Sequence, residues 1–302
     1  MKIVIPMAGM GKRMRPHTLT VPKPLIKIAG KSIVQRLIES LINFYQSPVE
    51  EIAFVIGDFG VEIEKELIEI AEKLGSKGIL YHQEEALGTA HAVYCAKESL
   101  QGEVIVAFAD TLFYSDFAMA GDADGIIWVK RVEDPSAYGV VKSDEDGIVT
   151  DFIEKPKEPV SDKAIIGIYY FKKAGQLRDA IKYLIDNNIK GNNEFQLTDA
   201  LENLRDENLK FKTQQVDKWL DFGNFRASLK AHKQVLEAEM GEGIESLPKD
   251  VVLNDVALVP PYYIAPGCRI ENAVIGPNAS IADNCVIVSS VVKNSIIQED
   301  SF

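Results

Sequence analysis

Apolar runs alternate with amphipathic segments over the first hundred residues, and this alternation constrains the fold more than any other feature. The runs are continuous, as in strands buried on both faces of a parallel sheet. The segments between them place apolar residues at helical spacing. The predicted strands are 2–5, 51–57, 78–83 and 103–109, and the predicted helices are 33–44, 61–74 and 88–100. This order predicts an α/β fold with a doubly wound, mostly parallel sheet, in which ligands bind beyond the carboxyl ends of the strands.

The section from 125 to 220 alternates less regularly. A predicted hairpin turns at Asp144 to Gly147 between two apolar runs. The predicted elements are strands at 125–132, 138–142, 147–154, 164–171 and 209–216, and helices at 174–185, 195–205 and 225–240. They extend the same domain, which we bound at residues 1–242.

The sequence changes character after Gly241. An aliphatic residue then recurs about every six positions, with the second unit one residue short. These positions are Ile264, Ile270, Ile275, Ile281 and Ile287. Such hexads are typical of a parallel β-helix with three short strands per coil. We predict a short β-helix domain at 251–302, with Cys268 and Cys285 stacked in its core because they occupy the same place in their hexads.

A glycine-rich, basic loop follows the first predicted strand. It contains Gly9 and Gly11, and the stretch up to Arg36 holds eight basic residues and no acidic one, in a chain whose net charge is −12. Such a concentration of cations suits a polyanionic ligand, most simply phosphate groups. Glycines let backbone N–H groups approach a phosphate closely, Arg13 can bind its oxygens in a bidentate manner, and Lys23 supplies a point charge.

Two common phosphate-binding motifs do not fit this loop. The dinucleotide fingerprint needs a third glycine where this chain has Met14. The Walker A motif needs Ser or Thr after Gly-Lys, and here Arg13 follows Gly11 and Lys12. Taken alone, the loop would suit an ordinary surface turn equally well.

Carboxylates follow two other predicted elements. Asp110 comes directly after the strand at 103–109, in an apolar context where a charge is costly unless it binds something. Asp221 either caps the helix that follows it or joins Asp110 in holding Mg²⁺, whose preference for oxygen suits a nucleoside triphosphate. Glu154 and Lys155 end a strand, where a solvated turn with an exposed ion pair is the simplest interpretation.

Composition excludes several classes of partner. A net charge of −12 argues against a general nucleic-acid or anionic-membrane surface. No apolar run approaches the roughly 18 residues of a membrane span. Three cysteines without metal-type spacing indicate a reducing, cytoplasmic compartment.

Several short motifs, in their order and spacing, resemble the sugar-1-phosphate nucleotidylyltransferase family, and in particular its glucose-1-phosphate thymidylyltransferase-like members. The motifs are Gly9 to Pro16, Pro22 to Leu25, Leu87 to Ala90, Asp110, Tyr138 to Val140, Glu154 to Pro156, Glu194 to Asp199 and Trp219 to Gly223. The resemblance covers roughly residues 2–235 and implies the nucleotide-diphospho-sugar transferase fold for a catalytic domain at 1–242. The hexad tail is similar to the left-handed β-helix attached to many members.

The resemblance implies an enzyme of the EC 2.7.7 type with Mg²⁺ as cofactor. It would join a nucleoside triphosphate to a sugar 1-phosphate and release pyrophosphate, by in-line attack of the sugar-phosphate oxygen on the α-phosphorus. A phosphate nucleophile is already ionised at neutral pH, so no general base is required.

The resemblance also implies roles residue by residue. The catalytic residues would be Arg13, Lys23, Asp110, Lys155 and Asp221, with Asp110 and Asp221 as metal ligands. The nucleotide would be bound by Ala8, Gly9, Gly11, Arg13, Gln83, Gly88 and Thr89, and the sugar phosphate by Tyr138, Gly139, Glu154, Lys155 and Ile165. Lys12 departs from the family pattern, which usually has Thr or Ser there.

The resemblance bears on the choice of base and sugar through only three residues. Gln83 followed by Gly88 is similar to members that use dTTP or UTP. Ile165 stands where N-acetylhexosamine and mannose enzymes often have Asn, which favours glucose 1-phosphate.

The alternative interpretation is a non-catalytic, nucleotide-sugar-binding regulatory subunit of the same fold. The joint presence of all five predicted catalytic residues argues against it, because such a subunit would be free to lose some of them. These residues are Arg13, Lys23, Asp110, Lys155 and Asp221. The last predicted strands end abruptly at Phe302 and leave an open edge, so we expect a homo-oligomer.

Overall fold

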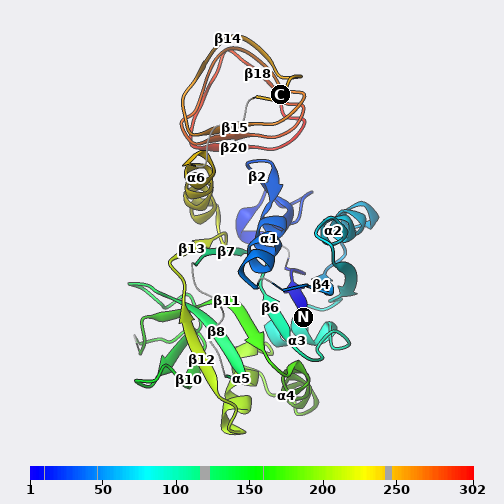
Figure 1. Cartoon of the computed structure of the whole chain (residues 1–302), viewed down its shortest axis with the longest axis vertical. Helices are drawn as coiled ribbons and strands as arrows, with labels where there is room; N and C mark the ends of the chain where they lie inside the picture. Colours follow the sequence, from blue (N-terminus) through cyan, green and yellow to red (C-terminus); the bar gives the residue numbers. More distant parts are fainter. Residues whose placement is uncertain (10, 46, 116–122, 159, 242–246) are drawn as a thin grey trace. The chain divides into compact units, whose positions relative to one another are not determined.

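The computed structural model describes residues 1–302 except 10, 46, 116–122, 159 and 242–246 (Figure 1). The chain forms two compact units. The first contains residues 1–10 and 37–219, and the second contains residues 11–36 and 220–302. The predicted linker between 242 and 251 falls largely outside the described residues, so the division into domains at 1–242 and 251–302 stays a prediction.

A nine-stranded sheet forms the centre of the first unit. Its strands are β1 (Lys2–Pro6), β4 (Glu51–Ile56), β5 (Lys77–His82), β6 (Val104–Ala107), β8 (Gly125–Arg131), β9 (Val140–Ser143), β10 (Val149–Ile153), β11 (Lys163–Phe171) and β12 (Phe211–Gln215). Strands β6, β1, β4 and β5 are neighbours in that order and all parallel. Strand β11 runs antiparallel to β6 and connects this half to β8 and to the predicted hairpin β9–β10.

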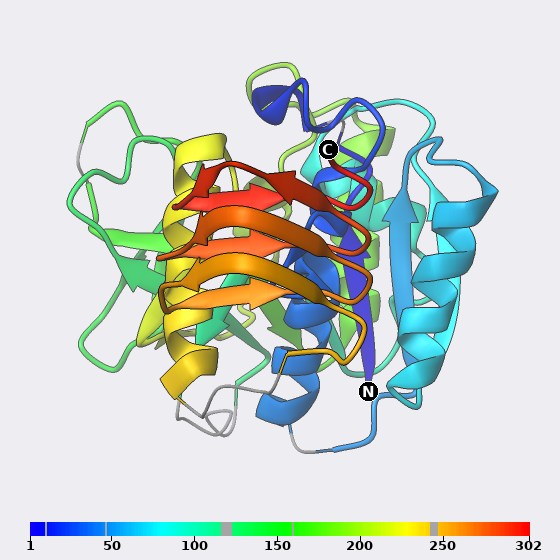
Figure 2. The same cartoon turned by 90° about the horizontal axis from the view of Figure 1, so that it is seen from above.

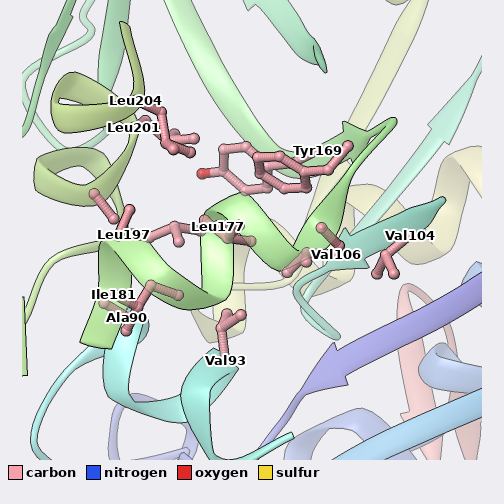
Figure 3. Close-up of a cluster of buried hydrophobic side chains, with 14 of the residues drawn as sticks. Ala90, Val93, Val104, Val106, Tyr169, Leu177, Ile181, Leu197, Leu201 and Leu204 are labelled. Carbon is pink, nitrogen blue, oxygen red and sulfur yellow. The ribbon is translucent and has the colours of Figure 1, made fainter. Parts of the chain in front are cut away.

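Helices cover both faces of the sheet. They are α1 (Ile33–Tyr45), α2 (Val61–Lys73), α3 (Thr89–Cys95), α4 (Ala174–Asp186) and α5 (Leu197–Asp206). Figure 3 shows side chains of α3, α4 and α5 converging on those of β6 and β11 in one buried cluster. Ile127 and Val129 of β8 belong to this cluster, so Trp128 between them faces the opposite side, where Phe44 of α1 contacts it edge-on at 5.8 Å. The predicted doubly wound α/β fold is therefore confirmed.

Local signals account for the start of α1 and the end of α2. Ser32 Oγ accepts a hydrogen bond from the backbone N–H of Gln35 at 3.3 Å and caps the start of α1. Gly75, with φ +80°, follows the end of α2. Helix α3 is shorter than the predicted 88–100, because from Ala96 the backbone forms tighter turns, such as the bond from Ala96 N–H to Val93 O.

The sequence patterns missed several short strands, two of which lie outside the large sheet, one directly after Asp110 and one that contains Trp219. These two are β7 (Thr111–Tyr114) and β13 (Lys218–Asp221), which pair with each other. Each has only four residues, too few to establish a period.

The second unit contains a stack of short parallel strands. Its elements are β2 (Lys27–Ile28), β3 (Lys31–Ser32), α6 (Phe225–Gly241), β14 (Val252–Leu258), β15 (Tyr262–Ile264), β16 (Arg269–Ile275), β17 (Ala279–Ile281), β18 (Val286–Val288), β19 (Val291–Val292) and β20 (Ser295–Ile297). The strands from β14 onward lie in successive turns (Figure 2). Ile264 pairs with Ile281 and Ile270 with Ile287, each 17 residues further on. This stacking is consistent with a short β-helix, whose left hand stays a prediction.

Hexad positions fill the interior of the stack. All five hexad isoleucines are buried and belong to one cluster, together with Cys268 and Cys285, whose thiols are free. The predicted placement of both cysteines in the core is thus confirmed. At a corner of the coil, Asn278 donates a side-chain hydrogen bond to Asn294 at 2.9 Å, and both have positive φ.

The hairpin β2–β3 packs on this stack within the second unit. The backbone N–H of Ala29 donates to Ser280 Oγ at 2.8 Å, and Lys27 Nζ lies 2.7 Å from a Glu299 carboxylate oxygen. The Tyr263 ring lies against Gly30, where an added Cβ would be 2.2 Å from the Tyr263 hydroxyl oxygen. The sequence patterns gave no sign of these contacts, because the partners lie about 250 residues apart.

The described part of the chain contains no helix long and apolar enough to cross a bilayer.

Candidate active site

A cavity of about 190 Å³ lies in the first unit. Its walls come from β11, from the loop before β9, from the end of β10 and from the start of α5. Four of the five residues predicted for the sugar phosphate line it, namely Tyr138, Gly139, Glu154 and Ile165. Thr89, predicted for the nucleotide, also lines it, whereas Lys155 does not. The volume suits a group about the size of one sugar ring rather than a larger ligand.

Gly139 keeps the cavity open. A Cβ at this position would lie 3.1 Å from Glu154 Oε2 and 3.4 Å from side-chain carbons of Ile165 and Thr198. Its carbonyl oxygen accepts a hydrogen bond from Ile165 N–H at 2.8 Å, which ties the loop to β11. A side chain here would therefore intrude among the residues that line the cavity.

Glu154 places a carboxylate in the polar wall, and Asp199 lies next to the lining residue Thr198. Glu154 Oε2 accepts a hydrogen bond from Thr198 Oγ1 at 3.4 Å. Burial raises the pKa of Asp199, and the Glu154 charge raises it further. Burial likewise raises the pKa of the Tyr169 phenol, which therefore stays protonated. The Glu154 carboxylate in this wall is an acceptor that suits the hydroxyl donors of a sugar.

Lys155 adopts an uncommon backbone conformation beside the cavity. Its φ is +42°, in the left-handed region that residues with a Cβ seldom occupy. Its N–H donates to Tyr138 O at 3.2 Å, and its Nζ lies 3.4 Å from Glu154 Oε1. The ion pair suggested by the sequence does form. Glu154 also lines the cavity, so this turn is part of the cavity wall and not only an exposed surface turn. Such strain is often found at functional positions.

Thr89 fixes the start of α5. Its Oγ1 accepts a hydrogen bond from Leu197 N–H at 2.9 Å and donates to Gln196 Oε1 at 3.5 Å. Gln196 and Thr198 both line the cavity and were not named individually from the sequence. They belong to the motif at 194–199, which was the signal that could have identified them.

Gln83 and Gly88 lie together at the carboxyl end of β5. Gly88 has φ +119°, and an added Cβ would lie 2.5 Å from the Phe195 carbonyl oxygen, so only glycine fits. Gln83 Nε2 lies 3.3 Å from Gly88 O and 3.1 Å from His91 Nδ1. These two residues, both predicted to bind the nucleotide, are thus in direct contact.

Asp110 stands just after β6, half-buried, and a chain of contacts connects its neighbour to the cavity. Thr111 Oγ1 accepts a hydrogen bond from Trp219 Nε1 at 2.6 Å. The Trp219 ring in turn contacts the Tyr138 ring edge-on, with 4.9 Å between the ring centroids. The strand that begins after Asp110 is thereby fixed relative to Tyr138.

The basic loop forms part of the second unit, and Met10 lies outside the described residues. Gly11 has φ +56°, and an added Cβ would lie 3.2 Å from Lys23 Cβ and from Thr18 Cγ2. Thr18 Oγ1 donates to Gly11 O at 2.9 Å. The loop thus folds back so that Gly11 and Lys23 are adjacent, while the Arg13 side chain is exposed. In the first unit, Ala8 and Gly9 follow β1, and Gly9 has open space around its Cα.

Asp221 is not the cap of α6. Asn224 performs that role, since its Oδ1 accepts a hydrogen bond from Ala227 N–H at 3.0 Å. Asp221 Oδ1 instead accepts a hydrogen bond from Gly223 N–H at 2.7 Å. The interpretation of Asp221 as the cap of the following helix is therefore wrong.

Comparison with known proteins identifies the family. A family model described as nucleotidyl transferase matches residues 2–238. This chain belongs to the nucleotidyl transferase family. A glucose-1-phosphate thymidylyltransferase of Streptomyces antibioticus is 28% identical to it, over the whole of this chain and 88% of the relative. A mannose-1-phosphate guanylyltransferase catalytic subunit beta of Drosophila pseudoobscura is 36% identical, over 60% of this chain and 50% of the relative.

Solved structures show the same fold. A nucleoside-diphosphate-sugar pyrophosphorylase from Vibrio cholerae superposes with a TM-score of 0.66 and 21% identity, over 77% of this chain and all of the other. Because relatives of this nucleotidyl transferase are named for different bases and sugars, family membership leaves both substrates open.

The two aspartates predicted as metal ligands have the type of donor that a magnesium ion prefers. Asp110 and Asp221 supply carboxylate oxygens, the ligands that Mg²⁺ prefers. The described residues contain no cluster of three or more His, Cys, Asp or Glu side chains suited to a metal. Mg²⁺ in nucleotide enzymes is commonly held by one or two carboxylates plus substrate phosphates, so a pair of aspartates is sufficient. Asp110 belongs to the first unit and Asp221 to the second, and their joint role stays a proposal.

Proposed function

We propose that this enzyme transfers a nucleotidyl group to a sugar 1-phosphate, with dTTP or UTP as donor and glucose 1-phosphate as acceptor. A phosphate oxygen of the sugar phosphate forms a bond to the α-phosphorus of the triphosphate. The bond from that phosphorus to the oxygen bridging to the β-phosphate breaks, and pyrophosphate leaves with its electron pair. The products are a nucleoside-diphosphate sugar and pyrophosphate.

The cavity around Gly139 and Glu154 is the observation that carries this proposal. It has room for a sugar ring, the Glu154 carboxylate as an acceptor for hydroxyl groups, and Lys155 beside Glu154 for the phosphate. Ile165 contributes an apolar wall without a hydrogen-bond donor, which supports glucose over a sugar that carries an amide. A hexose phosphate therefore matches the chemistry of this wall.

Charge is the main obstacle to the reaction, because two anions must approach each other. Arg13 would bind the departing pyrophosphate, Lys23 the α-phosphate and Lys155 the sugar phosphate. Cations positioned before the reaction stabilise the charge that develops on the oxygens, and the bound geometry aligns the attack. A general base is not needed, because the attacking phosphate is already ionised.

Asp110 and Asp221 would hold Mg²⁺ at the triphosphate. When bound, the ion would neutralise phosphate charge. The Asp221 carboxylate is oriented by the Gly223 N–H, and the Thr111 to Trp219 hydrogen bond fixes the strand that begins after Asp110.

A pairwise screen tests this function. Purified protein with Mg²⁺ is mixed with each of dTTP, UTP, GTP, CTP and ATP and with glucose, mannose, galactose and N-acetylglucosamine 1-phosphates, and pyrophosphate release is measured. We expect release with dTTP or UTP and glucose 1-phosphate. No release from any pair would refute catalysis, and calorimetric binding of nucleotide without release would favour the regulatory-subunit alternative.

Two further proposals concern the state of the protein. One is that the protein forms a homo-oligomer. A monomer mass measured by light scattering at micromolar concentration would contradict the homo-oligomer. Three free cysteines support a reducing, cytoplasmic compartment.

A further inference from the structure

The side-chain amide of Gln83 faces two acceptors at once. Its Nε2 lies 3.3 Å from the carbonyl oxygen of Gly88 and 3.1 Å from Nδ1 of His91. A peptide carbonyl can only accept hydrogen bonds, so the amide group that faces Gly88 must be the NH₂. Its second N–H is then directed to His91 Nδ1. That nitrogen must act as an acceptor and therefore carries no proton.

The surroundings of His91 favour this protonation state. The ring is half-buried in the first turn of α3. Burial lowers the pKa of His91, and the charge of Glu85 acts in the opposite direction. Cys95 Sγ lies 4.0 Å from the same Nδ1, a weak contact compared with the amide bond. A neutral ring with its proton on Nε2 supplies the acceptor that Gln83 needs.

This arrangement determines which part of the Gln83 amide is left to contact a ligand. With both N–H groups engaged, Gln83 can offer only its carbonyl oxygen Oε1 to a ligand. Within the described ranges, Oε1 has no hydrogen-bond partner. Uracil and thymine carry a ring N–H at N3 that can donate to this oxygen. Cytosine has a bare nitrogen at that position, which would oppose the oxygen lone pairs.

We propose that His91 is a positioning residue that, with the Gly88 carbonyl, locks the Gln83 amide with its oxygen outward and thereby selects a base with a ring N–H. This inference rests on the proposed function and on the predicted role of Gln83 in binding the nucleotide. His91 itself does not touch the nucleotide. Removing His91 would break one of the two hydrogen bonds that hold the Gln83 amide. The amide could then turn over, and discrimination between bases would weaken.

Nucleotide binding in the presence of Mg²⁺ tests the proposal without requiring turnover. Calorimetry is used to measure the affinities of UTP, dTTP and CTP for the wild type, for His91→Leu and for His91→Asn. Leucine removes the acceptor, whereas asparagine can return one through Oδ1. We expect the UTP-to-CTP affinity ratio to fall about tenfold in His91→Leu, the effect of one hydrogen bond, and to recover in His91→Asn.

Tyr94→Phe is the matched control, because it lies on the same helix and removes only a hydroxyl; it should leave the ratio unchanged. Circular dichroism verifies that each variant is folded. A wild type that does not prefer UTP or dTTP to CTP would overturn the inference, as would an unchanged ratio in His91→Leu or a failure of asparagine to restore it. Failure of the proposed function appears separately, as absence of pyrophosphate release while these affinities remain measurable.

Discussion

Trp219 Nε1 donates a hydrogen bond to Thr111 Oγ1 at 2.6 Å, and this bond connects two strands that lie 108 residues apart in the sequence. Thr111 is 2% exposed, so its hydroxyl has no access to replacement water. The same indole contacts the ring of Tyr138 in the cavity wall. Trp219 therefore couples the segment after Asp110 to the proposed sugar site.

Trp219→Phe should weaken sugar-phosphate binding selectively. The change removes the donor to Thr111 and loosens the contact with Tyr138, so we expect KM for the sugar 1-phosphate to rise several-fold while KM for the triphosphate stays unchanged. Steady-state kinetics measure both. Trp128→Phe is the control, because Trp128 Nε1 has no hydrogen-bond partner among the described residues. Equal effects on both KM values in Trp219→Phe would contradict the coupling.

Gly139→Ala should narrow the cavity. The new Cβ would lie 3.1 Å from Glu154 Oε2, closer than most real Cβ contacts, so Glu154 must shift. We expect kcat/KM for the sugar 1-phosphate to fall at least about tenfold, corresponding to about 1.4 kcal/mol of lost transition-state binding. Gly175→Ala in α4, where the nearest atom to the new Cβ is 3.9 Å away, should leave kinetics intact. Wild-type kinetics in Gly139→Ala would exclude this cavity as the sugar site.

Asp221→Asn should reduce turnover without changing stability, whereas Asn224→Ala should reduce stability without changing turnover. Asparagine keeps an oxygen for Gly223 N–H but loses the charge, so we expect turnover to fall about 100-fold or more with an unchanged melting temperature. Asn224→Ala removes the cap of α6, so we expect about 1 kcal/mol less stability with turnover retained. Pyrophosphate release and thermal melting separate the two. Retained turnover in Asp221→Asn would refute its metal role.

Ser280→Ala should loosen the hairpin β2–β3. Ser280 Oγ accepts the Ala29 N–H in a buried position, and its removal leaves that donor unsatisfied, at a cost of about 1–3 kcal/mol. Denaturant unfolding measures the change. Ser290→Ala, which removes an exposed hydroxyl in the same stack, should change stability by less than about 0.5 kcal/mol. Similar losses in both variants would indicate a general effect of serine removal.

His232 should make the protein sensitive to acid. The ring is fully buried, and burial, with the nearby positive charge of Arg36, lowers the pKa of His232 to about 4. The unfolded chain binds this proton near pH 6.5, so the folded state loses stability as the pH falls from about 6.5 to 4, by about 2 kcal/mol at pH 5. Unfolding at pH 7 and pH 5 measures the loss, which His232→Leu should reduce by this amount. An identical pH dependence in the two proteins would contradict the assignment.

The sequence alone placed most elements because their signals are local. The continuous apolar run at β1, the Ser32 cap and the hexad isoleucines each act over a few residues, and the structure has all three. The motifs likewise predicted four of the residues that line the cavity. Short-range periodicity and side-chain chemistry are readable without knowing the partners.

Tertiary structure decided which distant segments meet. Gln196 and Thr198 joined the cavity because Thr89 holds the start of α5, and Asp221 lost the capping role because Asn224 occupies it. The sequence determined the elements and the family motifs, since these depend on local spacing. Only the fold brought Gln83 against His91 and Ala29 against Ser280, because such pairings depend on how the burial of many apolar groups fixes the path of the whole chain.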